Sequence, residues 1–168
     1  MTQIDVRTAT PADSDQIKQL ALDNHMFEPD EMGDFDEMLQ GFFAGQLDGH
    51  QWLVATRGAD NPGGDVVAAA YYAPEPFSDR MWNLYFIATA PDAHGTGAGT
   101  ALIGHVEQQL RAAGEAVART LIVDTSSLDD YDGARRFYEA RGFVEKARLR
   151  DFYGPGDHKV TFWKSLVD

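Results

Sequence analysis

The chain has 168 residues, a length that suits a single domain with one core over residues 1–168. Hydrophobic residues make up 43% of the sequence and aromatic residues 11%, which supplies such a core and excludes disorder over most of the chain. The 27 acidic residues outnumber the 14 basic ones, and the net charge of −13 has the wrong sign for binding nucleic acid phosphates. The absence of cysteine excludes disulfides, thiolate metal sites and a cysteine nucleophile.

The first half of the chain alternates between strand and helix patterns. It begins MTQIDVRTAT, which lacks the basic segment and apolar stretch of a leader sequence, so we expect a cytoplasmic protein. Pro11, in the sequence Thr-Pro-Ala-Asp, predicts the start of a first helix, and residues 34–44 predict a second. The longest apolar run, residues 66–73, is too short to cross a membrane. The strands expected here cover residues 3–8, 51–56 and 65–72, and the turn formers at 59–64 join the last two as a hairpin.

The second half of the chain begins with a strand over residues 82–89 that runs directly into a glycine-rich segment. Apolar residues at helical spacing follow this segment as far as Gly114, where glycine is a natural helix end. The remaining expected elements are a buried strand at 120–124, a helix at 131–141 and two closing strands at 143–153 and 158–165. Together the elements predict an α/β protein of mixed α+β type, with a mixed central sheet of about seven strands and about four helices on both faces.

The glycine-rich segment, residues 94–99, connects its strand to the helix behind it. Three glycines at alternate positions let the backbone approach an anion, and the helix start supplies unpaired N–H groups and a positive dipole end. This favours a phosphate or pyrophosphate ligand, although a tight strand-to-helix connection would use the same residues. Thr100 and Leu102 break the two dinucleotide-binding registers, and no lysine lies between Lys18 and Lys146 for a nucleotide triphosphate loop. We therefore expect neither NAD nor ATP bound through those motifs.

Two motifs resemble those of the GCN5-related N-acetyltransferases, the GNAT family, which transfer an acetyl group from acetyl-coenzyme A (acetyl-CoA) to an amine. The first is Gln or Arg, two residues, Gly, one residue, then Gly or Ala, after a strand ending near a proline, and residues 91–102 occupy it. His94 heads it here, and retains a donor for a phosphate oxygen. The second is Ala, three residues, Tyr, then Gly-Phe, which residues 134–143 match. The resemblance covers most of the chain and implies the GNAT fold, with acetyl-CoA as the cofactor.

The resemblance also implies where the chain would hold acetyl-CoA. The strand at 82–89 would pair with the pantetheine arm, and Tyr131 stands where many members carry an Asn that contacts this arm. The implied cofactor-binding residues are Ile87, Ala88 and Thr89 at the end of the strand, His94 through its side chain, and Gly95, Thr96, Gly97, Ala98, Gly99 and Thr100 through their main-chain N–H groups.

Tyr138 and Asp124 are the candidates for proton transfer. The resemblance places Tyr138 at the thioester sulfur, where a phenol with a pKa of about 10 can protonate the departing thiolate. The alternative role for Tyr138 is packing its helix on the sheet. Asp124 ends an otherwise apolar strand, so we expect desolvation to raise the pKa of its carboxyl toward that of a general base. Its alternative role is to accept hydrogen bonds from residues 125–127.

The last hairpin is the first candidate for the acceptor site. In the family that this sequence resembles, the corresponding hairpin lies beside the acceptor. An ordinary polar hairpin loop is the alternative. The candidate residues, which would bind the acceptor or relay its proton, are Asp151, Tyr153, Asp157 and His158.

An acidic segment, residues 28–37, is the second candidate. Opposite charge would raise the local concentration of a cationic acceptor. The alternative is a solvated loop whose Asp34 caps the second helix. The residues that we expect to attract the acceptor are Glu28, Asp30 and Glu31. The isolated histidines show no metal-ligand spacing, so no metal is expected.

The predicted function is an N-acetyltransferase that moves an acetyl group from acetyl-CoA directly to an amine, because no cysteine is present to carry an acyl group. The amine belongs to a small molecule or to a protein terminus, and neither nucleic acid nor a membrane is an expected partner. The alternative is a non-catalytic acyl-CoA-binding sensor of the same fold. The sequence leaves open the acceptor, the acyl-chain preference and whether the chain is a monomer or a homodimer.

Overall fold

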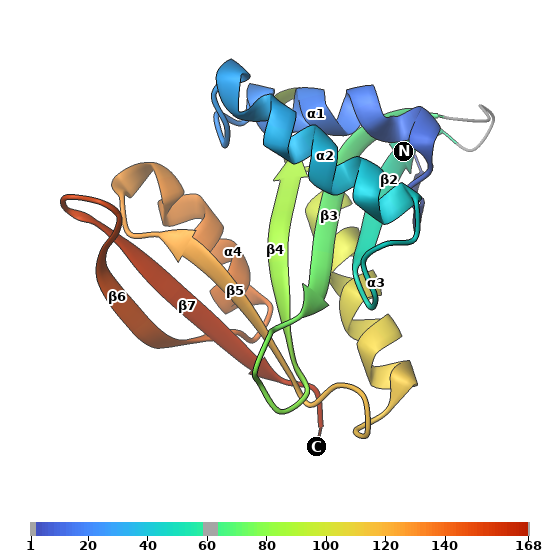
Figure 1. Cartoon of the computed structure of the whole chain (residues 1–168). Helices are drawn as coiled ribbons and strands as arrows, with labels where there is room; N and C mark the ends of the chain where they lie inside the picture. Colours follow the sequence, from blue (N-terminus) through green and yellow to red (C-terminus); the bar gives the residue numbers. More distant parts are fainter. Residues whose placement is uncertain (1–2, 59–63, 168) are drawn as a thin grey trace. The chain divides into compact units, whose positions relative to one another are not determined.

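The computed structural model describes residues 3–58 and 64–167 (Figure 1). Its strands form one sheet in the order β1-β2-β3-β4-β5-β7-β6. The strands are β1 (Ile4–Thr8), β2 (Gln51–Arg57), β3 (Asp65–Pro74), β4 (Met81–Thr89), β5 (Thr120–Ser126), β6 (Val144–Gly154) and β7 (Asp157–Ser165). The α-helices of the described residues are α1 (Ser14–Asp23), α2 (Met32–Phe43), α3 (Ala98–Ala113) and α4 (Asp132–Ala140).

The sheet is mixed, as the sequence predicts. β4 and β5 run parallel, whereas β1 and β2, β2 and β3, β5 and β7, and β6 and β7 are antiparallel pairs. The predicted α/β class, with about seven strands and about four helices, is therefore confirmed. No helix among residues 3–58 and 64–167 is long and apolar enough to cross a membrane.

The chain forms two compact units. The N-terminal unit contains residues 1–73 and 86–108, and the C-terminal unit contains residues 74–85 and 109–168. β4 and α3 each contribute residues to both units.

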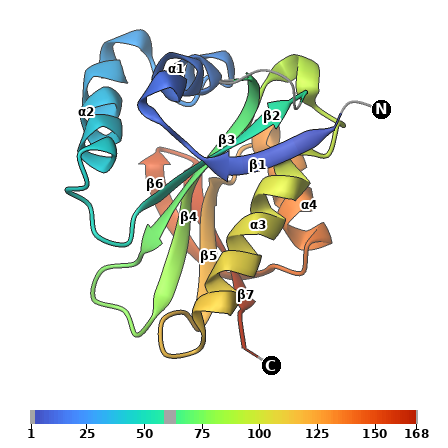
Figure 2. The same ribbon diagram turned by 90° about the vertical axis from the view of Figure 1, so that its right-hand side faces the viewer.

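The N-terminal unit has helices on both faces of its strands (Figures 1 and 2). Ile17 and Leu20 of α1 and Leu39 of α2 are buried in a cluster with Trp52 of β2, because apolar residues at helical spacing face the strands. Alternate residues of β2, such as Leu53, are also buried, as expected of a strand covered on both faces. Figure 2 shows α3 crossing the face opposite α1 and α2.

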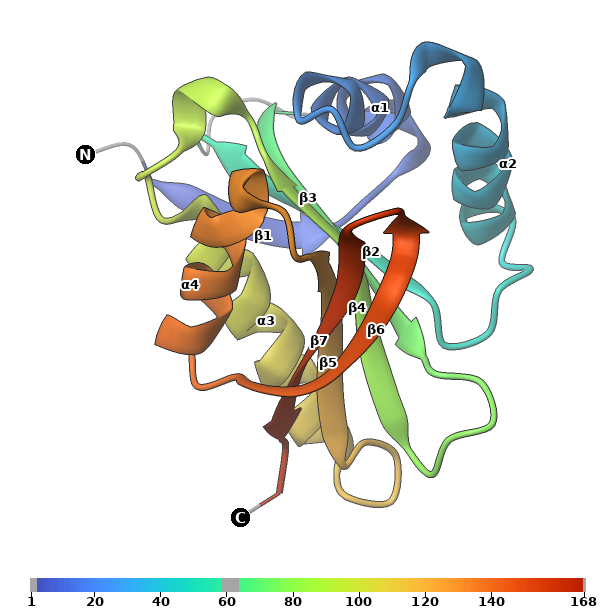
Figure 3. The same ribbon diagram turned by 90° about the vertical axis from the view of Figure 1, so that its left-hand side faces the viewer.

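The C-terminal unit is built around β5 and the long β6–β7 hairpin (Figure 3). Val123 of β5 and Phe162 of β7 are partners in the sheet and are both buried. The ring of Tyr138 on α4 packs on this face, with its centroid 5.7 Å from that of Phe162. Successive residues of a strand alternate between faces, so Asp124 and its partner Thr161 lie on the opposite face.

Most predicted elements are present, but several boundaries differ. β5 continues to Ser126, so Asp124 lies inside the strand and not at its end. α2 begins at Met32, two residues before the predicted start, and Asp34 lies in its first turn. The expectation that Asp34 caps this helix is therefore wrong. Five residues of the predicted hairpin turn at 59–64, residues 59–63, lie outside the described residues.

Candidate active site

The glycine-rich segment of the N-terminal unit has the backbone that its composition predicts. Gly95 and Gly97 have φ angles of 81° and 88°, in the left-handed region that favours glycine. A Cβ atom built on either residue meets no heavy atom within 4 Å. The backbone of this segment is therefore open on the side where a side chain would stand, and a ligand can approach it closely.

The start of α3 supplies the donors of this segment. The helix begins at Ala98, and the first N–H groups of an α-helix have no partner within the helix. The N–H of Thr96 donates to the carbonyl oxygen of Ala93 at 3.2 Å, so it serves the turn itself. His94 is exposed at the end of the preceding short helical turn, Pro91–Ala93. The geometry fits the diphosphate of coenzyme A, an anion that a helix N-terminus stabilises.

The end of β4 leads directly into this segment. The pairs between β4 and β5 end at Leu84 and Val123, so Ile87, Ala88 and Thr89 extend beyond the part of β4 that pairs with β5. The carbonyl oxygen of Thr89 accepts a hydrogen bond of 3.1 Å from the Asn24 side chain.

Tyr138 of the C-terminal unit is 5% exposed, and its ring packs against three phenylalanine rings. Its ring centroid lies 5.6, 6.0 and 5.7 Å from those of Phe137, Phe143 and Phe162. Burial, with a smaller contribution from nearby Tyr153, raises the pKa of Tyr138 well above its ordinary value. The Tyr138 hydroxyl makes no hydrogen bond to any residue that the structure describes. The side chain is therefore a neutral phenol with its proton available.

Asp124 faces the opposite side of the β5–β7 pair. One oxygen of its carboxylate accepts a hydrogen bond of 2.5 Å from the hydroxyl of Thr161. The predicted alternative, an acceptor for residues 125–127, is not what this carboxylate does, because its bond crosses to β7. Thr161 was not among the predicted site residues. The only sign of its position in the sequence is its alternation with the apolar residues Val160 and Phe162.

Tyr153 interacts electrostatically with both Tyr138 and Asp124. Burial first, then the negative charges of Asp124 and Asp157 and the proximity of Tyr131, raise the pKa of Tyr153 to about 12. Asp157 itself accepts a hydrogen bond of 2.5 Å from the hydroxyl of Ser126. The C-terminal unit thus brings together Asp124, Tyr153 and Asp157, three of the residues predicted from the sequence, and Ser126 joins them through its hydroxyl.

Asp151 and His158 are engaged with each other at the base of the β6–β7 turn. The N–H of Asp151 donates to Nδ1 of His158 at 2.9 Å, and the Asp151 carboxylate accepts from the N–H of Gly156 at 2.9 Å. These bonds hold Asp151 at a φ of 57°, a conformation that aspartate tolerates better than most residues. The contacts match the ordinary hairpin role that the sequence left open for this pair.

The acidic segment belongs to the N-terminal unit. Glu28 and Asp30 are exposed, and the Glu31 carboxylate accepts the N–H of Glu28 at 2.8 Å, which holds the short helical turn Pro29–Glu31. Glu31 thus has a structural role that its sequence position did not reveal. By sequence, the N-terminal unit carries 3 basic and 15 acidic residues, a net charge of −12, and the C-terminal unit carries 11 and 12. The strong negative charge of the protein therefore belongs almost entirely to the N-terminal unit.

The chain is similar to known acetyltransferases in sequence and in fold. The family model of the GNAT acetyltransferases matches residues 15–143. A crystal structure from Desulfovibrio desulfuricans, assigned to the GNAT family of acetyltransferases, has a TM-score of 0.85 and 29% identity, and the match covers 98% of this chain and 100% of that one. The search of curated protein sequences gave no match.

Two more distant structures have the same fold. The ribosomal-protein-S18-alanine N-acetyltransferase from Escherichia coli has a TM-score of 0.73 and 18% identity, over 99% of this chain and 96% of that one. NAA60 from Arabidopsis thaliana, in complex with acetyl-CoA, has a TM-score of 0.76 and 17% identity, over 97% and 98%. The family model spans the glycine-rich segment, Asp124 and Tyr138, and with the seven-stranded mixed sheet it shows that this chain belongs to the GNAT family of acetyltransferases.

Proposed function

We propose that the protein transfers an acetyl group from acetyl-CoA directly to an amine, and that both units belong to one catalytic domain. The observation that carries the proposal is the presence, within the C-terminal unit, of a buried neutral phenol on Tyr138 and of the Asp124 carboxylate, each of which interacts electrostatically with Tyr153. Amide formation from a thioester requires one group that removes a proton from the amine and another that donates one to sulfur. These two side chains have the chemistry for both roles.

Acetyl-CoA supplies the acetyl group as a reactive thioester. Asp124, directly or through a water molecule, takes a proton from the ammonium form of the acceptor, so that the nitrogen lone pair can attack the carbonyl carbon. The C–N bond forms, the C–S bond breaks, and Tyr138 donates its proton to the sulfur. The second proton that the nitrogen loses in becoming an amide returns to the Tyr138 phenolate through water, which restores the phenol. Asp124 and Tyr138 must both reach the one reacting carbonyl group, and each lies close enough to Tyr153 to interact with it electrostatically.

The cofactor belongs at the glycine-rich segment in this proposal. The N–H groups of Gly95, Gly97 and the first turn of α3 bind the diphosphate, and His94 adds a side-chain donor. Ile87, Ala88 and Thr89 offer their backbone to the pantetheine arm. Support comes from the positive φ angles, the open space beside both glycines and the family match, which spans this segment.

Release of free coenzyme A thiol in the presence of pooled primary amines tests the function. We expect thiol release that depends on both acetyl-CoA and an amine. A sensor of the same fold would gain thermal stability from acetyl-CoA because of binding alone, and would release no thiol. Stabilisation without release, over a broad set of amines, would contradict catalysis.

Replacing Gly97 by valine is expected to weaken acetyl-CoA binding by about 10-fold or more. Valine at a φ of 88° is strained, and its side chain occupies the space beside the backbone that we assign to the diphosphate. Calorimetry measures the change. Gly104→Val is the control, because Gly104 lies inside α3, the helix that follows Gly97, is exposed, and has no positive φ. Unchanged affinity in a folded Gly97→Val protein would place the diphosphate elsewhere.

A cationic acceptor should be sensitive to salt. Raising the ionic strength from about 0.01 M to about 0.15 M shortens the screening length from roughly 30 Å to roughly 8 Å, so we expect the KM for the acceptor to rise about 3-fold with little change in kcat. The double variant Glu28→Gln, Asp30→Asn should give a similar rise at low salt and leaves Glu31 to hold its turn.

The control for this double variant removes two exposed acids elsewhere, by Asp48→Asn and Glu139→Gln. Steady-state kinetics at both salt concentrations compares the two. An equal rise in KM for both double variants assigns the effect to total charge, and no rise in either leaves Glu28 and Asp30 as solvated surface.

A further inference from the structure

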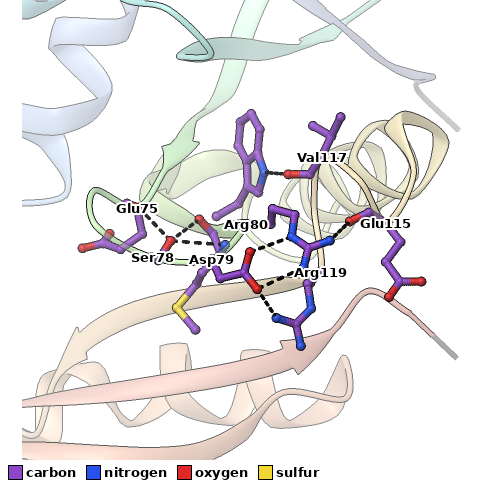
Figure 4. Close-up of polar contacts among 9 residues, drawn as sticks. Glu75, Ser78, Asp79, Arg80, Glu115, Val117 and Arg119 are labelled. Atoms are coloured by element: carbon purple, nitrogen blue, oxygen red, sulfur yellow. Dashed lines mark hydrogen bonds and ion pairs between the residues drawn. The ribbon is translucent and has the colours of Figure 1, made fainter.

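The turn between β3 and β4 carries a carboxylate without an ionic partner. Glu75 is half-buried, and no basic side chain among residues 3–58 and 64–167 forms an ion pair with it. The two nearby arginines are taken by Asp79, which lies 2.7 Å from Arg80 and 2.8 Å from Arg119. Figure 4 shows the Glu75 side chain pointing away from this group. The negative charge of Glu75 is thus left uncompensated within the C-terminal unit.

The turn that positions Glu75 is well fixed. The N–H of Glu75 donates to the carbonyl oxygen of Met81 at 2.8 Å, and the Ser78 hydroxyl donates to the carbonyl oxygen of Glu75 at 2.7 Å (Figure 4). The hydrogen bonds from Arg80 hold the pKa of the Asp79 carboxyl at about 2, so Asp79 stays ionised and continues to hold both arginines at any ordinary pH. The backbone at Glu75 is therefore a rigid support for its carboxylate.

Asn83, on β4, is a buried polar residue beside Glu75. It is 97% buried, and its amide nitrogen donates to the Glu75 carboxylate at 3.0 Å, which orients the amide toward that residue. Its carbonyl oxygen, Oδ1, is buried and has no hydrogen-bond partner among the described residues. The same Glu75 oxygen accepts the Tyr85 hydroxyl at 2.6 Å. The Glu75 carboxylate therefore lies against an amide whose buried oxygen lacks a hydrogen-bond donor among the described residues.

We propose that Glu75 and Asn83 form a binding subsite for a primary ammonium group. An ammonium carries a positive charge for Glu75 and three N–H donors, one of which can satisfy Asn83 Oδ1. A neutral hydroxyl would supply a donor but leave the charge of Glu75 uncompensated. A metal ion would require more ligands than these two side chains provide.

This subsite lies on the same face of the sheet as Asp124. Asn83 pairs with Ile122 in the parallel β4–β5 ladder, and Asp124 is two residues farther along β5. Strand geometry separates the two rows by about 7 Å along the strand and the strands by about 5 Å. The half-buried side chain of Ile122 lies between them and offers an apolar surface. The subsite therefore fits one ammonium group of an aliphatic diamine while the other nitrogen is acetylated. This assignment rests on the function proposed above for Asp124.

The test compares 1,5-diaminopentane with n-pentylamine, two amines of equal chain length that differ in the second nitrogen. We expect the wild-type protein to acetylate the diamine with a kcat/KM at least about 10-fold higher, the effect of one charge-assisted contact. Glu75→Gln keeps the shape and removes the charge, so it should lower kcat/KM for the diamine about 10-fold and leave that for n-pentylamine within about 2-fold. Glu115→Gln, an exposed acid of the same unit, is the control and should change neither.

Thermal stabilisation without acetyl-CoA provides a readout that does not depend on catalysis. We expect 1,5-diaminopentane to raise the Tm of the wild-type protein and not that of Glu75→Gln. This result supports the subsite even if no amine releases coenzyme A, an outcome that would overturn only the proposed function. Equal kcat/KM for the two amines in the wild-type protein, or equal losses for both in Glu75→Gln, would overturn the subsite while N-acetylation stands. Absence of both stabilisation and turnover would overturn both proposals.

Discussion

Replacing Asp124 by asparagine is expected to lower kcat/KM for the acceptor by about 100-fold, the lower end of a general-base contribution. The amide side chain keeps an oxygen for the Thr161 hydroxyl, so the strand pairing should survive. It cannot take a proton at any ordinary pH. The loss should therefore lie in the chemical step and leave the affinity for acetyl-CoA unchanged. The measurement is kcat/KM for one amine at a fixed pH, with calorimetry of acetyl-CoA binding beside it.

Thr161→Val is the matched control for this variant. It removes the hydrogen bond to Asp124 and keeps the carboxylate, so it should alter kcat/KM much less than Asp124→Asn does. A similar kcat/KM in the two variants would contradict the assignment. The role of base would then pass to Asp157, the other carboxylate close to Tyr153.

The fold followed from the sequence because its strong signals are local. The strand pattern over residues 51–56, the helix start at Pro11 and the glycine turn before α3 each depend on a few neighbouring residues, and all of these elements are present. Boundaries were less accurate where tertiary contacts extend an element. β5 runs two residues past Asp124 because its partner β7 continues the ladder to the pair Ser126 and Lys159.

The candidate site was only partly accessible to the sequence. Asp124, Tyr153 and Asp157 were expected to act, but their proximity depends on the register of β5, β6 and β7, which no local pattern specifies. The structural role of Glu31 was missed because a carboxylate that caps a short turn has the same composition as one that attracts a ligand.

The Glu75–Asn83 pair could not be predicted from the sequence at all. Glu75 follows a strand and Asn83 interrupts an apolar one, yet neither residue is unusual in a sequence. What distinguishes them is the burial of the amide, its contact with the carboxylate and the diversion of both nearby arginines to Asp79. Each of these features requires three-dimensional coordinates.

Replacing Tyr138 by phenylalanine is expected to lower kcat by about 10-fold or more and to change the affinity for acetyl-CoA little, because the proton is needed only as the C–S bond breaks. The aromatic contacts with Phe137, Phe143 and Phe162 do not use the hydroxyl, and this hydroxyl makes no hydrogen bond among the described residues. The variant should therefore keep or slightly raise the wild-type Tm. A lower kcat in this variant would therefore report the loss of the hydroxyl and not a loss of packing.

The raised pKa of Tyr138 makes a second expectation possible. A phenol whose folded-state pKa lies above the ordinary value of about 10 stays protonated below that pH, so ionisation of Tyr138 should cause no loss of kcat up to about pH 10. Single-turnover measurements of the thiol, with amine in excess, give the rate of the chemical step in both proteins. Because phenylalanine keeps the ring packing, a role in packing alone predicts an unchanged rate, and wild-type turnover in a Tyr138→Phe protein would reduce Tyr138 to a core residue. A slow chemical step with an unchanged Tm would assign the leaving-group proton to its hydroxyl.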